Sequence, residues 1–260
     1  MADAILVLNA GSSSLKFSLY ANENDGPRGW LRGQIEGLYT APKFSANDVQ
    51  GALLHRRDWK ASTALGHEGA IDFLLEFLQQ ELSGRQLIAV GHRVVHGGMQ
   101  FTAPVHIDAQ VIAELDRLIP LAPLHQPHNL QSIRAIAQRA PELAQVACLD
   151  TAFHRAQEPI AQAFALPPAI TDRGVRRYGF HGLSYEYIAY VLPRYDAAAA
   201  RGRVECVERH ARIAGKRWAA RKAGDRSFLP IAFGASEVRW QPPSADWMRW
   251  SLPAASASTR

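Results

Sequence analysis

Hydrophobic residues form short strand-like runs and helical periods along the first 204 residues of the chain. Four runs rich in aliphatic and β-branched residues favour strands, at Ala4–Leu8, Leu15–Tyr20, Leu87–Val90 and Val146–Leu149. Helices are predicted where apolar residues return every three or four positions, over Gly69–Leu82, Ala109–Ile119, His128–Arg139 and Ser184–Leu192. Pro127 suits the first turn of the third helix, and Ser184 suits the cap of the fourth. Alternating strands and helices indicate an α/β protein.

This order ends near Val204. Four of the six tryptophans and ten arginines lie in residues 201–260, and no apolar period of strand or helix length continues there. We expect residues 205–260 to be poorly ordered, because they offer no periodic apolar face to offset their chain entropy. We favour the product of a frameshift just after Val204, because enrichment in Arg, Ala, Pro and Trp is typical of an out-of-frame reading of a GC-rich gene. A divergent surface extension and an aromatic and basic RNA-binding tail stay open as alternatives.

The net charge of +5 comes from the same tail. Residues 201–260 hold 12 Lys or Arg against 5 Asp or Glu, which gives this segment +7 and the first 200 residues −2. Basicity therefore does not indicate a nucleic-acid partner for the main fold. No apolar run is long enough to span a membrane, and the start of the chain lacks the basic residues of a secretory signal, so we expect a cytoplasmic protein without a membrane partner. Cys148 and Cys206 lie too far apart for a metal knuckle.

The first candidate site follows the first strand, where the chain reads Asn9-Ala10-Gly11-Ser12-Ser13-Ser14-Leu15-Lys16. A turn of this composition presents backbone N–H groups and hydroxyls to phosphate oxygens, and the lysine adds a charge. It is not a Walker A loop, because a strand follows the turn and the Gly-Lys-Ser/Thr order is missing. Taken alone, such a turn is more often a simple connector.

Of the next two motifs, Gly91–Gly98 follows a buried strand and Pro120–Asn129 precedes a helix. Gly91–Gly98 holds Arg93, which could bind a carboxylate or phosphate through two hydrogen bonds, or could belong to a tight turn with structural histidines. Pro120–Asn129 holds three prolines that stiffen a loop. It could hold a side chain in place or could be a plain connector.

Each of the last two motifs holds one polar candidate residue. Cys148–His154 places Asp150 at the end of an apolar strand, where an acid orients a metal or substrate, or caps a turn. Tyr178–Gly182 places His181 between glycines, in a catalytic or a structural role.

Together, in this order and spacing, the five motifs resemble the acetate kinase family, within the acetate and sugar kinase, heat-shock ATPase and actin superfamily. The resemblance covers residues 4–204. It implies two ribonuclease-H-like domains around a cleft, a reversible transfer of the γ-phosphoryl group of ATP to acetate that gives ADP and acetyl phosphate, Mg²⁺ as cofactor, and a homodimer. Propionate and butyrate kinases are similar enough to be alternatives.

The resemblance also implies roles for single residues. It implies Asn9 at the magnesium site, ATP contacts at Ser12, Ser14 and Lys16, Asp150 as the acid/base residue and His181 as the transition-state stabiliser. Because acetate is already ionised at neutral pH, no base is needed, and we expect Asp150 to position substrate or metal instead. Substrate binding is implied for a further set: Arg93, Val95, Leu124, His125 and Phe180.

Several segments of the family pattern do not occur in residues 205–260, including the His-Leu-Gly-Asn-Gly phosphate loop and the Met-Gly-Thr-Arg segment with a second arginine. We therefore expect a complete first domain over residues 1–150, an incomplete start of a second over 151–204, and a non-matching tail over 205–260. Such a chain would be an impaired kinase or, as the alternative, a non-catalytic fragment that binds anions or a partner.

Overall fold

The structure is a computed structural model, and it describes residues 3–195, 205–209 and 217–221. The chain divides into two compact units, Met1–Ser184 and Tyr185–Arg260. This division falls between the expected boundaries at residues 150 and 204, which stay predictions. None of the helices in the described part of the chain is long and apolar enough to cross a bilayer.

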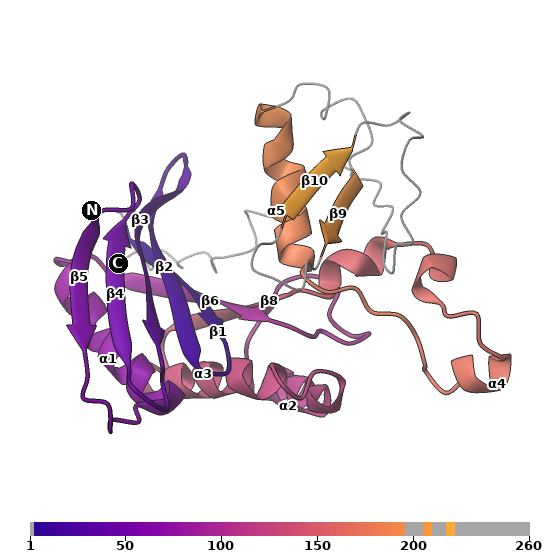
Figure 1. Ribbon diagram of the computed structural model, residues 1–260, viewed down its shortest axis with the longest axis horizontal. Helices are drawn as coiled ribbons and strands as arrows, with labels where there is room; N and C mark the ends of the chain where they lie inside the picture. The colour runs from indigo at the N-terminus through magenta and orange to yellow at the C-terminus, as the bar shows by residue number, and fades with distance from the viewer. Residues whose placement is uncertain (1–2, 196–204, 210–216, 222–260) are drawn as a thin grey trace, which may run out of the picture. The chain divides into compact units, whose positions relative to one another are not determined.

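An eight-stranded mixed sheet forms the centre of the first unit, in the order β5-β4-β3-β2-β1-β6-β8-β7 (Figure 1). The strands β1 to β5 run antiparallel as a meander, β6 and β8 run parallel to β1, and β7 pairs antiparallel with β8. Their bounds are β1 Ala4–Ala10, β2 Ser14–Glu23, β3 Gly26–Glu36, β4 Lys43–Asp48, β5 Leu53–Asp58, β6 Leu87–Val94, β7 Val105–His106 and β8 Ala144–Leu149.

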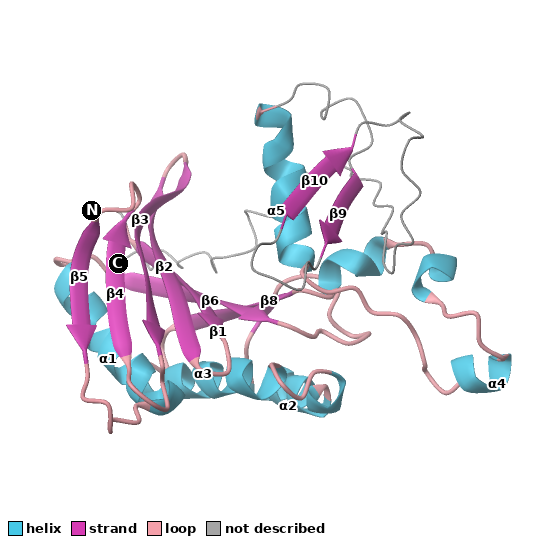
Figure 2. Ribbon diagram, in the orientation of Figure 1, coloured by secondary structure: helices cyan, strands magenta, loops and turns pink. Residues whose placement is uncertain are grey.

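The helices α1, α2 and α3 lie together on one side of this sheet (Figure 2). The helices and short 3-10 turns are α1 Gly66–Glu81, α2 Ala109–Arg117, η1 Ile119–Leu121, α3 Gln126–Arg139, η2 Ala152–Ala156, η3 Pro159–Gln162, α4 Pro168–Thr171, α5 Gly182–Val191 and η4 Leu192–Arg194. All four predicted strands and all four predicted helices are confirmed, with shifted ends.

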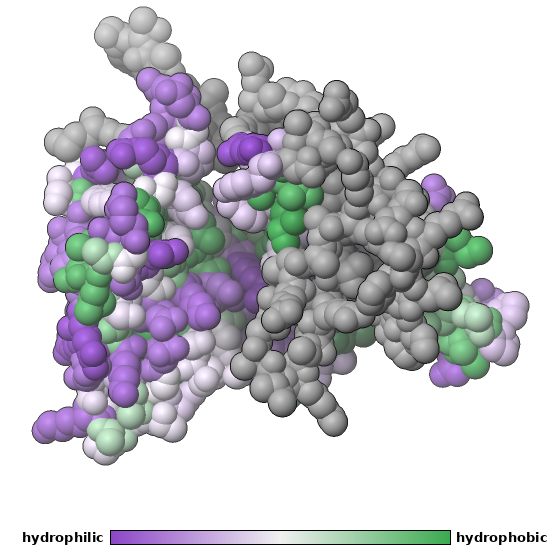
Figure 3. All heavy atoms as spheres, turned by 45° about the horizontal axis from the view of Figure 1, so that its top comes forward, coloured by the Kyte–Doolittle hydropathy of each residue, from purple (hydrophilic) through white to green (hydrophobic). Residues whose placement is uncertain are grey.

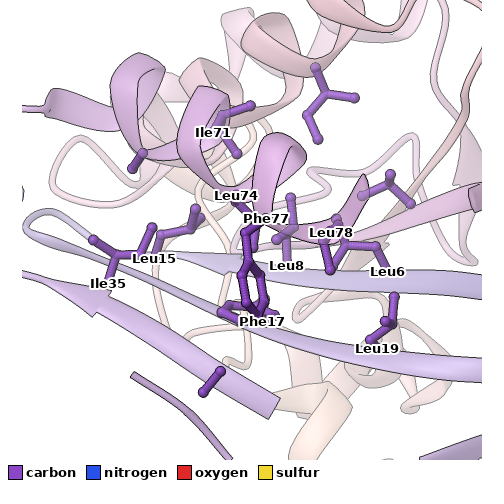
Figure 4. Packing of buried hydrophobic residues seen from close by; sticks show 14 of the residues in the cluster. Leu6, Leu8, Leu15, Phe17, Leu19, Ile35, Ile71, Leu74, Phe77 and Leu78 are labelled. Carbon is purple, nitrogen blue, oxygen red and sulfur yellow. The ribbon is translucent and has the colours of Figure 1, made fainter. Parts of the chain in front are cut away.

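The helix-facing side of the sheet is the main core. Alternate residues of β1 and β2 are buried against apolar residues of α1, as the close view in Figure 4 shows. The Phe17 ring packs against Gly33 of β3 and leaves no room for a side chain there. A Cβ on Gly33 would lie 2.5 Å from the Phe17 ring and 2.4 Å from the Ser45 carbonyl oxygen. The cluster consists mainly of Leu6, Leu8, Leu15, Phe17, Leu19, Ile35, Ile71, Leu74, Phe77 and Leu78.

The opposite face of the sheet carries a row of polar side chains near the site. The register places Asn9, Lys16 and Gln34 in one row across β1, β2 and β3, and their side chains point away from the core. Where described residues are visible on this side, hydrophilic colours predominate (Figure 3). The polar row lies at the end of β1 that leads into the Gly11–Ser13 turn.

The structure departs from the expected elements in several places. The strands β3, β4 and β5 are not predicted, because the glycines, proline and charges of Gly26–Glu36 hide their alternation. Ser184 is not a helix cap, since α5 begins at Gly182 and the Ser184 N–H donates to the His181 carbonyl.

Within the tail, the structure describes one pair of antiparallel strands, β9 Glu205–Arg209 and β10 Arg217–Arg221. The sequence predicts no regular element here, but backbone pairing of a hairpin does not require a sustained apolar period. The rest of the predicted disordered tail lies outside the described residues.

Candidate functional site

Four of the predicted site residues meet where β1, β6 and β8 end. Asn9 is the sixth residue of β1, Arg93 lies near the end of β6, Asp150 directly follows β8, and His181 directly precedes α5. In α/β sheets, ligands bind in the crevice beyond the carboxyl ends of such strands. Residues far apart in the sequence thus converge where a ligand site is expected.

Arg93 is the centre of this group. Its Nη2 lies 2.6 Å from Oδ2 of Asp150, and its Nε donates to the same carboxylate oxygen at 3.2 Å. Its Nη1 donates to Oδ1 of Asn9 at 3.3 Å, and Nδ1 of His181 lies 3.5 Å from Nη2. The Arg93 side chain is 32% exposed whereas Asp150 is 2% exposed. A buried carboxylate therefore orients a guanidinium that still reaches solvent, an arrangement suited to binding an anion.

The backbone around His181 is constrained on both sides. His181 has φ of 58°, in the left-handed region, and the next N–H, of Gly182, donates to the Asp150 carbonyl at 3.0 Å. A Cβ on Gly182 would lie 2.0 Å from that carbonyl oxygen, and a Cβ on Gly179 would lie 2.2 Å from the His154 ring. The two glycines thus let the Tyr178–Gly182 motif pack directly against the segment that follows β8, and this packing presents His181 to Arg93.

Burial lowers the pKa of two histidines around this centre. Nε2 of His154 donates a hydrogen bond to the Phe180 carbonyl at 3.0 Å, and the pKa of His154 is lowered mainly by burial. His96 accepts from the Gly98 N–H through Nδ1 at 2.9 Å, and burial lowers its pKa as well. Its ring lies 4.5 Å from that of Tyr178 and 6.0 Å from that of Phe180, between centroids. These aromatic contacts connect the second motif to the fifth.

A third histidine, from α1, forms a hydrogen bond with the Gly/Ser turn after β1. His67, near the start of α1, contacts the Gly11 carbonyl through Nε2 at 2.8 Å, and Tyr39 Oη contacts its Nδ1 at 2.8 Å. The pKa of His67 is lowered, chiefly by burial. A neutral ring with its proton on Nε2 satisfies both contacts, since Nε2 then donates to Gly11 and Nδ1 accepts from the tyrosine hydroxyl. The turn itself is closed by the Gly11 N–H donating to the Ser14 carbonyl at 2.8 Å.

The remaining predicted site residues lie around this group without a described hydrogen bond to it. Lys16 faces the same side as Asn9, its register partner across the β1–β2 ladder, and is exposed. Ser12 is exposed in the turn and Ser14 is half-buried at the start of β2. The residues implied for substrate binding divide by burial: Val95 is buried, whereas Leu124, His125 and Phe180 are exposed.

Sequence reasoning missed the buried polar residues that hold the site loops. Gln126, which is fully buried, accepts from the His96 N–H at 3.1 Å and donates to the His96 carbonyl at 3.0 Å. Asn129 contacts Val95 and Ala10, and the Thr151 hydroxyl accepts from the Gly97 N–H at 2.8 Å. The signal available in the sequence was a pair of amide residues three positions apart, Gln126 two residues before the helix predicted over His128–Arg139 and Asn129 in its first turn.

Comparison with known proteins gives one consistent result. The model of the Acetokinase family matches residues 4–199. The acetate kinase of Rhodopseudomonas palustris (strain TIE-1) is 47% identical over 207 residues, and the match covers 78% of this chain and 52% of the relative. That of Rhizobium meliloti is 46% identical over 202 residues, with 78% and 51% covered.

Solved structures agree. The crystal structure of Porphyromonas gingivalis acetate kinase has a TM-score of 0.69 at 33% identity, with 86% of this chain and 56% of that chain covered. A propionate kinase from Francisella tularensis has a TM-score of 0.66 at 32% identity, with 74% and 49% covered. These similarities confirm the expected fold class, of the actin and sugar-kinase type, and the chain spans about half the length of the curated relatives it matches. The family match ends five residues before Val204, and over residues 4–199 the chain belongs to the Acetokinase family.

Proposed function

We propose that this chain carries the acyl-binding side of a phosphotransferase site that moves the γ-phosphoryl group of ATP to acetate. A carboxylate oxygen of acetate attacks the γ-phosphorus, the bond from that phosphorus to the bridging oxygen of ADP breaks, and ADP leaves with the electron pair. The observation that carries the proposal is the cluster of Asn9, Arg93, Asp150 and His181 at the carboxyl ends of the strands. ATP as co-substrate favours a cytoplasmic location.

The proposed reaction requires positive charge and hydrogen-bond donors more than it requires a base. Acetate is an anion at neutral pH, so the barrier lies in joining two anions and in stabilising the charge of the transferring group. Arg93 binds the carboxylate in this proposal, and His181 donates to the transferring phosphoryl group. Asp150 holds the guanidinium, which is supported by its 2.6 Å ion pair with Arg93 and by its burial. This role differs from the acid/base role implied by the resemblance.

Magnesium fits this group of residues. Among the described residues, no three or more His, Cys, Asp or Glu gather for a metal. Mg²⁺ does not need such a cage, because it commonly takes one or two protein oxygens and fills its other positions with water and substrate phosphates. The amide oxygen of Asn9 is such a ligand: one of its two lone pairs accepts from Nη1 of Arg93, and the other would hold the ion that arrives with ATP. The ion would neutralise charge on the phosphates.

Binding and turnover test the proposal separately. In ¹⁵N-labelled protein, acetate should shift the Arg93 Nε–H resonance, and Arg93→Lys should weaken acetate binding by about tenfold or more, since a bidentate contact is lost. An acetyl-hydroxamate assay with ATP, Mg²⁺ and acetate should give a rate below about one-thousandth of a full-length relative's. Loss of one transition-state contact typically lowers the rate by about 10²–10³-fold, and this chain spans about half the length of that relative. That residual rate should vanish in Arg93→Ala.

Each result has a distinct meaning. Acetate binding without any Arg93-dependent turnover would overturn the transferase proposal in favour of a non-catalytic anion-binding fragment. No acetate binding at all would overturn both the transferase proposal and the anion-binding alternative. Propionate should be tested in parallel, since one of the similar structures is a propionate kinase. One methylene changes the binding free energy by only about 1–3 kcal/mol in an apolar pocket, so the preference between the two acids has to be measured.

A further inference from the structure

The strands β1 and β6 separate at the site. Their parallel pairing ends at Leu8 and His92, although β1 continues to Ala10 and β6 continues to Val94. Asn9 and Arg93, which contact each other through Oδ1 and Nη1 at 3.3 Å, are the first residues after the last pair. Beyond this point, β1 and β6 have no backbone ladder between them to set their spacing.

One side chain of α3 bridges the separated ends. Asn129 is 3% exposed, its Nδ2 donates to the Ala10 carbonyl at 2.8 Å, and its Oδ1 accepts from the Val95 N–H at 3.0 Å. A carboxamide carries the same donor and acceptor as a peptide group. The Asn129 side chain therefore takes the place of a ladder step between a residue of β1 and the residue after β6.

We propose that Asn129 is a positioning residue that sets the distance between the two halves of the site. On one side, Ala10 connects Asn9 to the Gly11–Ser13 turn, which would contact the phosphates. On the other, Val95 follows Arg93 by two residues and belongs to the implied acyl pocket. The functional part of this inference rests on the proposed function, but the bridge between the strands does not.

Gln126, one turn earlier in α3, provides a matched control. It too is a buried amide that bonds a backbone N–H and carbonyl, but both belong to His96, and a longer contact at 3.4 Å reaches the Leu115 carbonyl. Gln126 therefore holds α3 to the segment after β6 without reaching β1. Asn129→Asp and Gln126→Glu each keep the acceptor oxygen, remove the donor and place one carboxylate in the core.

Backbone amide exchange in the whole chain distinguishes the two side chains. In Asn129→Asp, exchange of the Gly11 N–H should rise about tenfold, because the bond from Nδ2 to Ala10 that steadies the turn is lost, while the Val95 N–H keeps its acceptor and stays protected. In Gln126→Glu, the Gly11 N–H should be unchanged. Unchanged Gly11 exchange in Asn129→Asp, or an equal rise in both variants, would overturn the proposal.

Two further measurements keep the test decisive. Should Asn129→Asp fail to fold, the unaltered protein is informative: the Asn129 Nδ2 protons should exchange at least about tenfold more slowly than those of the exposed Gln131 in the same helix, and equal rates would refute the bridge. Where turnover is measurable, Asn129→Asp should lower kcat about tenfold or more with acetate KM changed less than about twofold, because spacing matters when both substrates are bound. A rise in KM alone would contradict a positioning role, whereas an unaltered chain without turnover would contradict only the proposed function.

Discussion

Acidification should destabilise this protein through a histidine in the core of its sheet. His92 lies on β6 with 2% of its surface exposed, and its Nε2 contacts Oε1 of Gln145 on β8 at 2.8 Å. Burial lowers the pKa of His92 from 6.5 to about 4, although the hydrogen bond to Gln145 opposes this shift. The neutral ring donates from Nε2 to the amide oxygen of Gln145.

The sign and size follow from proton linkage. The unfolded chain binds a proton at His92 near pH 6.5 and the folded chain does so near pH 4, so the stability from the neutral ring is complete above 6.5 and lost as pH falls toward 4. Between about pH 7.5 and about pH 5, this single group should remove about 2 kcal/mol from the free energy of unfolding. His67, His96 and His154, whose pKa values are also lowered by burial, act in the same direction.

Urea unfolding of the whole chain at the two pH values measures the effect. The variant His92→Gln can keep a neutral hydrogen bond to Gln145. Between about pH 7.5 and about pH 5, its free energy of unfolding should therefore fall by about 2 kcal/mol less than that of the unaltered protein. The contributions of the other histidines cancel in this difference. His106→Gln is the control, because the His106 side chain is exposed. If His92→Gln lost as much stability on acidification as the unaltered chain, the reasoning would be refuted.

Three other predictions concern the site and the tail. Gly182→Ala should destabilise the fold by about 1–3 kcal/mol in thermal unfolding, since its Cβ would lie 2.0 Å from the Asp150 carbonyl oxygen. The control Gly69→Ala, whose Cβ would lie 3.4 Å from its nearest neighbour, should be neutral or stabilising, and equal effects of the two substitutions would contradict this packing argument. In a chain extended to full family length, His181→Ala should lower kcat by about 10²–10³ with less change in acetate KM, and Arg93→Ala should raise acetate KM as well; steady-state kinetics that show the reverse pattern would contradict the assigned roles. If a frameshift explains the tail, a shifted frame after codon 204 should encode the missing phosphate loop, and nucleotide sequencing that finds it in neither alternative frame would disprove the hypothesis.

The sequence predicts the central elements of the fold because their burial is strongly periodic. β1 alternates buried and outward residues over Ala4–Ala10, and α1 buries Ile71, Leu74 and Leu78 along one face. The strands β3 to β5 carry weaker signals. A glycine fits position 33 of β3 because the ring of Phe17, its partner on β2, occupies the space that a side chain would fill. This fit depends on the pairing of β2 with β3, so the sequence of β3 alone does not reveal it.

The candidate site is predictable as a set of segments but not as a set of contacts. Asp150 at a strand end and Arg93 after a buried strand are positions where ligands bind in α/β proteins. Nothing in either segment indicates that the two side chains pair at 2.6 Å, or that Asn9 and His181 contact the same guanidinium. Those contacts depend on register between β1, β6 and β8 and on the glycines beside His181, which act over separations of more than 50 residues.

The charge of the site also follows from the contacts and not from the composition. Arg93 and Asp150 form an ion pair, and Asn9 is uncharged, so this part of the cluster supplies direction for an anion more than net positive charge. Two anions must nevertheless approach each other in the proposed reaction, and the transferring group needs a cation nearby. Lys16 lies in the same row of the sheet as Asn9 and is exposed, and a magnesium ion held at Asn9 would add to it. In the proposed reaction, the Arg93–Asp150 pair, held by β6 and the end of β8, would orient the anion. Lys16 and a metal at Asn9, placed side by side by the register of β1 with β2, would supply the attraction.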